Sequence, residues 1–570
     1  MHGFGISISF SNDFIINDFQ WKKPFSFQTE FEKRKLQLKN FYAEQYTLKK
    51  FIHEKIWLHN EKYFMVTEGI ITNIDELLLK YSTTTIASLM DILFEKEHFF
   101  QEFRGNFCGF LYNKRNETFV AFNNHTGTKK VFFFKNKKIA LVCTDLFTLT
   151  NALKRLNINY SPDISSAYLL LSSGFMIGNK TLVAEIQQIS AGEYIEITQT
   201  NVSLYSYFQI SEIIETSDPK SEIISRFDFL FKQAIKREFD IDKKHRLISI
   251  STLSGGLDSR MTALIAHKMG YNQVLFNFSE KGYADQLIAQ DIAKAFNLKL
   301  IFSPLDGTSL TNIDENITVN DGLTIYTGTS HVFSAMKNIN IENSGIIHTG
   351  ILGDAIFGSY LKSVKPKKPE IYDGNYSTLL THKTSKLKTE IALKYLTEEL
   401  YKFNTRGFYG INNGFLFFDL AGESLSPFLD ADFLQYVLSI PRKYRFKEKI
   451  YIEWIRNYYP DISNFVWENI GGKPTNNEIL RAYYRTKRAI IKRIPINTMW
   501  KNNMNPEQFW YDNQPKVKKI LDQYFIDYLH QTDFDKELQN DVIKLYKNGK
   551  INEKTQVVTL LSAYKLLFSN

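Results

Sequence analysis

A glycine-rich stretch at residues 253–259 constrains the fold of this chain more than any other feature. It lies between an apolar run at 247–253 and an amphipathic run at 260–269, and this order predicts a strand, a tight loop and a helix. The stretch consists of Leu253, Ser254, Gly255, Gly256, Leu257, Asp258 and Ser259. Glycines let backbone N–H groups approach an anion, the helix N-terminus adds partial positive charge, and the two serines can donate hydrogen bonds. The sequence therefore predicts a phosphate-binding loop.

An acidic residue distinguishes this loop from a P-loop. No lysine follows the second glycine, and Asp258 lies inside the loop instead. A carboxylate beside a phosphate implies a bridging cation, and Mg²⁺ prefers oxygen ligands of this kind. With Mg²⁺ on Asp258, the loop is expected to hold the pyrophosphate end of ATP, the part that is released when a substrate is adenylated.

Strand and helix patterns alternate after the loop, and this order predicts a parallel sheet. Helices are predicted at 260–269 and 284–296, and strands at 247–253, 274–278, 300–302 and 345–349. Ligands of such sheets bind beyond the carboxyl ends of the strands. After about residue 395 the pattern is mainly helical.

The loop resembles the SGGxDS motif of the N-type ATP pyrophosphatases, and two later segments resemble one branch of them, the class B asparagine synthetases. Residues 346–358 stand where that family has SGEGSDEVFG, and residues 423–430 match its EARVPFLD segment. The likeness covers nearly the whole chain. It implies a mixed α/β and α+β protein. A degenerate Ntn-hydrolase-like sandwich, of the class II glutamine amidotransferase type, is expected at 1–212, and a parallel-sheet ATP pyrophosphatase domain with a helical extension at 218–570.

The resemblance also implies a nucleotide site. Asp354 is the expected second Mg²⁺ carboxylate, and because it and Asp258 each follow a strand, they can share the ion. Thr349 and Gly350 precede Asp354 and are expected to bind ATP together with the loop. Ser279 lies where relatives bind the nucleotide, although it could equally cap a helix.

Two further residues are catalytic candidates on the same resemblance. Glu423 occupies the place of a glutamate that assists deprotonation of the attacking amine in β-lactam-forming members, or it is a structural anchor at a helix start. Lys473 lies roughly where the family has an essential lysine, or it is an ordinary surface lysine.

The N-terminus indicates which kind of member the chain resembles. Glutamine-using relatives begin Met-Cys, and the cysteine is the nucleophile that hydrolyses glutamine. Here His2 occupies that position, and an imidazole cannot replace a thiolate in this chemistry. Residues 67–73 and 123–127 also depart from the family's glutamine-binding NGEIYN and RDxxG segments. The glutaminase is therefore expected to be inactive.

Composition excludes several other classes. Cys108 and Cys143 are the two cysteines among 570 residues, which argues against a disulfide framework or a cysteine-based zinc site. The chain has no signal-peptide pattern and no apolar run long enough for a membrane span, so a cytoplasmic protein without membrane contact is expected. The net charge of +9 reflects basic clusters at 362–368 and 481–493, which could be solvated surfaces or could dock an acidic or peptidic partner. No nucleic-acid partner is expected.

Departures from the family bear on the substrate. Ile351, Ala355 and Leu425 replace two glutamates and an arginine of asparagine synthetase, so aspartate recognition is doubtful and a more apolar pocket is expected. A synthetase with an inactive glutaminase domain resembles the β-lactam synthetases and the lasso-peptide macrolactam cyclases. We favour ATP-dependent macrolactam or isopeptide closure of a ribosomal peptide, with a leader-processing protease as a possible partner.

Three other hypotheses remain open. One is an ammonia-dependent amide synthetase acting on a small acid, and another is a non-catalytic ATP-binding scaffold. A tRNA-modifying pyrophosphatase shares the glycine loop, but it should lack both the large N-terminal region and the 423–430 segment that this chain contains.

Overall fold

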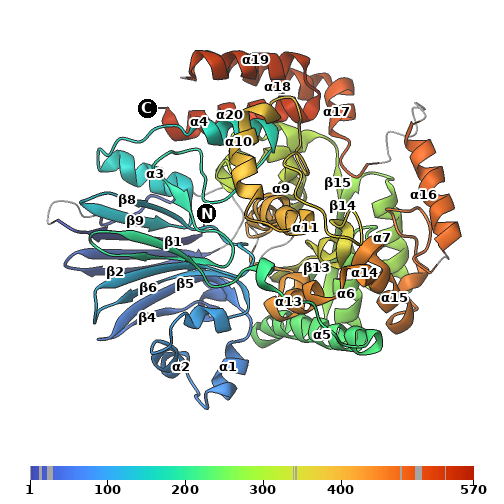
Figure 1. Ribbon diagram of the computed structural model, residues 1–570, viewed down its shortest axis with the longest axis horizontal. Helices are drawn as coiled ribbons and strands as arrows, with labels where there is room; N and C mark the ends of the chain where they lie inside the picture. The colour runs from blue at the N-terminus through green and yellow to red at the C-terminus, as the bar shows by residue number, and fades with distance from the viewer. Residues whose placement is uncertain are drawn as a thin grey trace.

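The computed structural model describes residues 2–11, 16–21, 30–337, 339, 343–420, 422–475, 478–493, 503–532 and 534–569. Figure 1 shows two antiparallel sheets on the left and a parallel sheet surrounded by helices on the right. This mixture of sheet types agrees with the expected α/β and α+β class.

The N-terminal part contains two six-stranded antiparallel sheets. The first has the strand order β10 (Gln187–Gln188), β8 (Phe132–Lys135), β9 (Ile139–Cys143), β1 (Gly3–Ser9), β3 (Phe41–Leu48) and β2 (Phe31–Leu38). The second has β12 (Val202–Ser206), β11 (Glu193–Ile197), β7 (Thr118–Asn123), β6 (Gly105–Asn113), β5 (Tyr63–Ile71) and β4 (Trp57–His59). Phe4 and Ile6 of β1 share one buried core with Phe64 of β5 and Phe110 of β6, so the inward-facing residues of the two sheets pack together.

Helices cover the outer faces of these sheets. The helices α1 (Ile74–Lys80) and α2 (Ile86–Leu93) pack on the second sheet, and α3 (Leu146–Arg155) and α4 (Ile164–Ser172) pack on the first. The predicted domain boundary at 212–218 falls between β12 and the long helix α5 (Lys220–His245).

The C-terminal part is built on a five-stranded parallel sheet. Its strand order is β15 (Leu300–Leu305), β14 (Gln273–Glu280), β13 (Ile248–Thr252), β16 (Ser344–His348) and β17 (Ser424–Leu425). One face packs on α5, α6 (Asp258–Lys268) and α7 (Ala284–Ala295), and the other packs on α8 (Ile313–Asn320), α9 (Ser330–Met336) and α12 (Gly414–Phe418). The four strands and two helices predicted for this region are present within a few residues of their expected ends.

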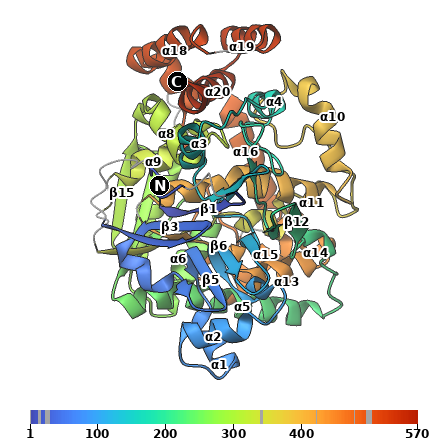
Figure 2. The ribbon, with the colours of Figure 1, turned by 90° about the vertical axis from the view of Figure 1, so that its left-hand side faces the viewer.

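The rest of the C-terminal part is helical, as expected. It comprises α10 (Thr381–Ala392), α11 (Glu398–Lys402), α13 (Ala431–Ser439), α14 (Arg442–Arg445), α15 (Lys449–Tyr458), α16 (Glu478–Arg493), α17 (Glu507–Asn513), α18 (Pro515–Leu529), α19 (Lys536–Asn548) and α20 (Ile551–Phe568). The last three form a layer at the top of Figures 1 and 2, where they share a core with α4 and α8. Within the described ranges, no helix is long and apolar enough to cross a membrane.

Candidate functional site

The predicted phosphate loop connects β13 to α6, at the carboxyl end of the strand. Ser254 and Ser259 organise it, because the Ser254 N–H donates to Ser259 Oγ at 2.9 Å and the Gly256 N–H donates to Ser254 Oγ at 3.1 Å. The Gly255 N–H donates to the carboxylate of Asp285 at 2.6 Å. The N–H groups of the first turn of α6 have no intrahelical acceptors, so they remain the natural anion donors of this loop.

A second glycine loop, at 349–354, packs directly against the first. A Cβ atom on Gly350 would lie 2.3 Å from the Ser259 nitrogen, and one on Gly353 would lie 2.6 Å from Asp258 Cγ. Leu352, between them, has a left-handed backbone with φ of 65°, a conformation that costs energy for a residue other than glycine. The two loops therefore touch at a place where only glycine fits, because β13 and β16 are neighbours in the sheet.

The two predicted metal carboxylates meet at this contact. The Asp354 N–H donates to Asp258 Oδ2 at 2.9 Å, and the Tyr451 hydroxyl donates to Asp258 Oδ1 at 2.9 Å. Burial, and then the charge of Asp354, raise the pKa of Asp258 well above its usual range. Burial also raises the pKa of Asp354. Two carboxylates that resist ionisation beside each other are stabilised by a divalent cation, so the donor set fits Mg²⁺.

A cavity of about 370 Å³ opens beside the loops. At its polar end lie Leu253, Ser254, Gly256, Asp258, Ser259, Thr349 and Gly350. The remaining wall is largely apolar and includes Phe276, Phe278, Val332, Ile351, Tyr376, Ile411, Phe418 and Met504. The structure thus brings most of the predicted nucleotide-binding residues to one pocket.

Two polar side chains in this pocket have an unused hydrogen-bonding atom. Asn277 donates to the Leu253 carbonyl at 2.7 Å, but its buried Oδ1 has no partner. His331 Nδ1 is also buried without a partner, and burial lowers the pKa of His331 to about 4, so the ring is neutral at pH 7. Because unpartnered buried polar atoms are rare in folded proteins, both are candidate ligand contacts.

Two arginines near the pocket were not predicted from the sequence. Arg260, fully buried, donates through Nη2 to the carbonyls of Gly255, at 3.2 Å, and Val466, at 2.6 Å. Burial lowers its pKa to about 10, which still leaves it charged at pH 7. Arg406 lies 5.7 Å from the ring of Tyr376, and its charge acts on Asp354. The hydrophobic spacing of α6 indicated its apolar residues but gave no sign that Arg260 is buried.

The structure places two predicted residues outside the pocket. Ser279 is buried at the end of β14, where its hydroxyl donates to the Glu280 carbonyl at 3.1 Å. Lys473 is exposed. It follows a turn that contacts the phosphate loop, since the Glu468 N–H donates to the Gly255 carbonyl at 2.9 Å. Neither side chain lines the cavity.

Glu423 also lies away from the pocket, which argues against the predicted role as a general base. Its carboxylate is buried between two lysines, with Oε1 2.7 Å from Lys55 Nζ and Oε2 2.8 Å from Lys129 Nζ. Burial alone would raise the pKa of Glu423, but the charges of Lys129 and Lys55 outweigh burial and hold it well below its usual range. A carboxylate held in this way accepts a proton poorly, and the alternative of a structural anchor fits the geometry better.

His2, at the predicted position of the lost nucleophile, belongs to the same buried cluster. Its Nδ1 lies 2.8 Å from Glu68 Oε1, and its Nε2 lies 3.1 Å from the Asp419 carbonyl. The imidazole is therefore used in contacts between the two halves of the chain.

The substitutions expected to enlarge the substrate pocket have different outcomes. Ile351 lines the cavity as expected. Leu425 does not, because it packs against Phe51, Ile70, Ile241 and Ile346 on the other side of its strand. Ala355 is buried in the core beside α6. The expectation that Leu425 shapes the pocket is therefore wrong.

Comparisons with known proteins show a likeness over part of the chain. Residues 232–406 match the family model of asparagine synthase. No curated protein matches the chain. A structure of the allosteric regulatory enzyme of purine biosynthesis aligns at 7% identity over 53% of this chain and 74% of that one, with a TM-score of 0.22. Glutamine phosphoribosylpyrophosphate amidotransferase from B. subtilis, complexed with ADP and GMP, aligns at 10% identity over 64% of this chain and 79% of that one, with a TM-score of 0.21.

The region that matches the asparagine synthase model, residues 232–406, contains both glycine loops and both aspartates. This match indicates that the chain is an ATP-dependent, amide-forming ligase of the asparagine synthetase kind.

Proposed function

We propose that this protein adenylates a substrate carboxylate with ATP and transfers the acyl group to an amine, releasing AMP and pyrophosphate. The observation that carries the proposal is the contact, beside the cavity, between two glycine loops that each contain one aspartate. Mg²⁺ held by Asp258 and Asp354 would neutralise charge on the departing pyrophosphate. The asparagine synthase match supports the same reaction class.

The proposed reaction has two steps. A carboxylate oxygen of the substrate attacks the α-phosphorus, and the bond from that phosphorus to pyrophosphate breaks. The amine then attacks the acyl carbon, the bond from carbon to AMP breaks, and the amine loses one proton. The first turn of α6 and the hydroxyls of Ser254 and Ser259 supply hydrogen-donating groups around the phosphates, so most of the catalysis is positioning and charge stabilisation.

We infer that glutamine is not the nitrogen source. His2 replaces the nucleophilic cysteine, and its ring is held by Glu68 and the Asp419 carbonyl. The amine is therefore expected to come from the substrate itself or from free solution.

The pocket supports an apolar acyl donor over aspartate. Among its described lining residues, none is lysine or arginine, and His331 is neutral at pH 7. A small dianion needs fixed cations, whereas Ile351, Ile411 and Phe418 offer apolar surface. We favour intramolecular closure of a peptide, of the macrolactam or isopeptide kind, in which one acidic side chain of the peptide is activated.

The test incubates purified protein with Mg-ATP and a panel of substrates. Two of them are peptides with an Asp or Glu side chain, one with a free and one with an acetylated N-terminus. The others are small acids with ammonia, and glutamine. AMP is measured by chromatography, and the product by mass spectrometry. Peptide closure predicts AMP together with loss of one water from the free peptide and no such product from the acetylated peptide. AMP with small acids and ammonia alone would instead identify an ammonia-dependent synthetase. Binding of ATP without AMP from any substrate would contradict the proposal.

A further inference from the structure

Residues 419–420 and 422–432 form a segment that contacts the second glycine loop. The N–H of Thr349 donates to the Leu425 carbonyl at 2.9 Å, and the Ser426 hydroxyl donates to the Ile351 carbonyl at 3.1 Å. Thr349 and Ile351 line the cavity. A displacement of this segment would therefore move the second glycine loop.

One end of the segment is fixed by what we call the lysine cluster, which consists of Lys55, Glu68, Lys129, Asp419 and Glu423. Lys129 Nζ lies 2.7 Å from Asp419 Oδ2 and 2.8 Å from Glu423 Oε2. Lys55 bridges Glu423 and Glu68 from the other side. No side chain of this cluster is more than 9% exposed, so its charges depend on one another. Both lysines lie in loops of the N-terminal part, whereas Asp419 and Glu423 belong to the C-terminal part.

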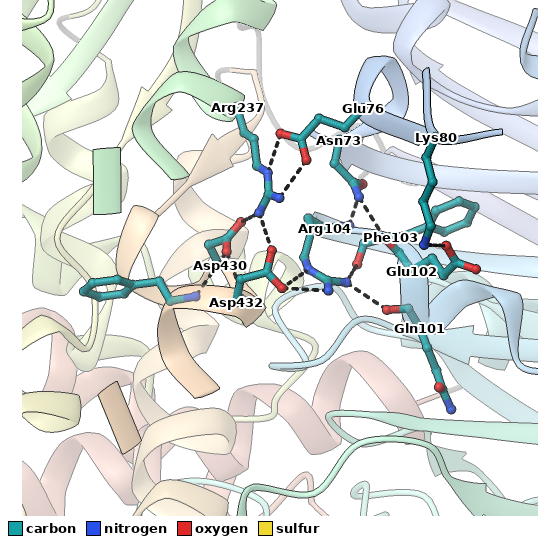
Figure 3. Close-up of polar contacts among 11 residues, drawn as sticks. Asn73, Glu76, Lys80, Gln101, Glu102, Phe103, Arg104, Arg237, Asp430 and Asp432 are labelled. Atoms are coloured by element: carbon teal, nitrogen blue, oxygen red, sulfur yellow. Dashed lines mark hydrogen bonds and ion pairs between the residues drawn. The ribbon is translucent and has the colours of Figure 1, made fainter. Parts of the chain in front are cut away.

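The other end is fixed by the arginine cluster, which consists of Glu76, Arg104, Arg237, Asp430 and Asp432 (Figure 3). Figure 3 shows Asp432 between two guanidinium groups, with Oδ1 2.7 Å from Arg104 Nη2 and Oδ2 2.7 Å from Arg237 Nη1. Arg237 also binds Asp430 at 2.9 Å and both oxygens of Glu76, at 2.9 and 2.7 Å. Burial alone would raise the pKa of Asp432, but the arginines lower it to about 2. Arg104 and Glu76 again belong to the N-terminal part.

The N-terminal part contacts the pocket at other points as well. Between the two clusters, Asn106 of β6 donates to the Ser424 carbonyl at 2.7 Å. Asn412 donates to the Thr126 carbonyl at 2.7 Å, next to the lining residue Ile411. The lining residue Thr324 donates to the Gly174 carbonyl at 3.0 Å. The N-terminal part thus contacts several of the segments that line the cavity.

A metal site is the competing interpretation of the lysine cluster. Ligand atoms of His2, Glu68 and Glu423 all lie within 4.8 Å of one another. However, Lys55 Nζ already forms ion pairs with both carboxylates. An ammonium group therefore already occupies the position between these two carboxylates that a cation would take.

We propose that the two N-terminal sheets serve as a frame that positions the adenylation pocket, with Lys129 and Arg104 as positioning residues. Neither side chain lines the cavity, so they act through Glu423, Asp432 and the segment between them. This inference rests on the proposed adenylation. It assigns the N-terminal part a role in the reaction that requires no glutaminase chemistry.

The experiment compares Arg104→Met and Lys129→Met with Lys180→Met. The control removes the 2.6 Å ion pair between Lys180 and Asp163, which lies within the N-terminal part. AMP formation is measured against ATP concentration, and hydrogen exchange is followed in amides of residues 349–354 and 424–426. Arg104→Met is the principal variant, because its partner Asp432 is 30% exposed and the fold should tolerate the loss. Arg104→Lys tests for rescue.

A frame predicts that kcat falls about 10- to 100-fold in the two cluster variants, the loss typical of small misplacements of reacting groups. It also predicts faster exchange at 349–354, partial rescue by Arg104→Lys and no kinetic change in Lys180→Met. Unchanged kcat and exchange in folded Arg104→Met, or equal losses in Lys180→Met, would overturn the inference. If Lys129→Met does not fold, the Arg104 series alone decides. If the wild type forms no AMP, the proposed function has failed, and exchange at 349–354 with bound ATP still reports on the frame.

Discussion

The substitution Glu423→Gln separates the two roles considered for this residue. The amide keeps the shape of the side chain but removes its charge, and this leaves Lys55 and Lys129 in a buried site with Glu68 and Asp419 as their remaining anions. Breaking a buried ion pair by removing one partner costs about 3–5 kcal/mol. We therefore expect the free energy of unfolding to decrease by about 3 kcal/mol. It is measured from the first unfolding transition in a urea denaturation curve. A general base would instead lose AMP formation with little change in stability.

The pH dependence of this loss provides a second check. The lysines hold the pKa of Glu423 below its value in the unfolded chain. The ionised Glu423 side chain therefore contributes its full stabilisation above the unfolded-state pKa of about 4.3. This stabilisation is lost as the pH falls through the folded-state pKa. The difference in stability between wild type and Glu423→Gln should be constant near neutral pH and should shrink only in acid.

A double-mutant cycle with Lys129→Met isolates the pair. The lysine substitution should cost less in the Glu423→Gln background, with a coupling of about 0.5–3 kcal/mol. Wild-type stability in Glu423→Gln, together with loss of the acid limb of the rate profile, would refute the reasoning and restore the general base.

Three further predictions concern the glycine loops. Asp354→Asn should reduce pyrophosphate release by about 100-fold at an unchanged melting temperature; wild-type release would exclude Asp354 from the site. Mg²⁺ should raise the melting temperature more at alkaline than at acidic pH, because the raised pKa values of Asp258 and Asp354 leave fewer ionised ligands in acid. Thermal denaturation with and without Mg²⁺ measures this increase, and an increase that is the same at every pH would contradict the prediction. Gly350→Ala places a Cβ atom 2.3 Å from the Ser259 nitrogen and should lower kcat/KM for ATP by about 10-fold or more, whereas kinetics like those of wild type would show that the loops can separate freely.

Local patterns predicted the parallel sheet and the positions of the two glycine loops. The alternation of apolar runs placed β13 and β16 within a residue or two of their observed ends, and the glycines after them marked the two loops. That Asp258 and Asp354 would meet followed from the rule that parallel strands carry their ligands at one edge. These features depend on short stretches of sequence, where periodicity and turn residues are informative.

Contacts between distant parts of the chain could not be predicted in this way. Glu423 and Lys129 are 294 residues apart, and Asn106 and Ser424 are 318 apart. No local pattern reports which charge a buried carboxylate will meet. Leu425 illustrates the same limit. The family motif led us to expect this side chain in the substrate pocket, whereas in the structure it packs against Phe51.

The buried charges between the two parts of the chain are better explained by geometry than by stability. Replacing a buried ion pair with well-packed apolar side chains is often neutral or stabilising, so the energy of folding does not by itself require Lys55 and Lys129 to be there. Each ammonium, however, contacts two carboxylates, and Glu423 is held from both sides. Few relative placements of the two parts satisfy all of these contacts, whereas apolar surfaces tolerate small shifts. For a reaction that depends on placing a carboxylate against the α-phosphorus of ATP, such a junction fixes the position of the pocket wall behind Thr349 and Ile351. Such a junction gives the N-terminal part a role in positioning the pocket that does not depend on any reaction of its own.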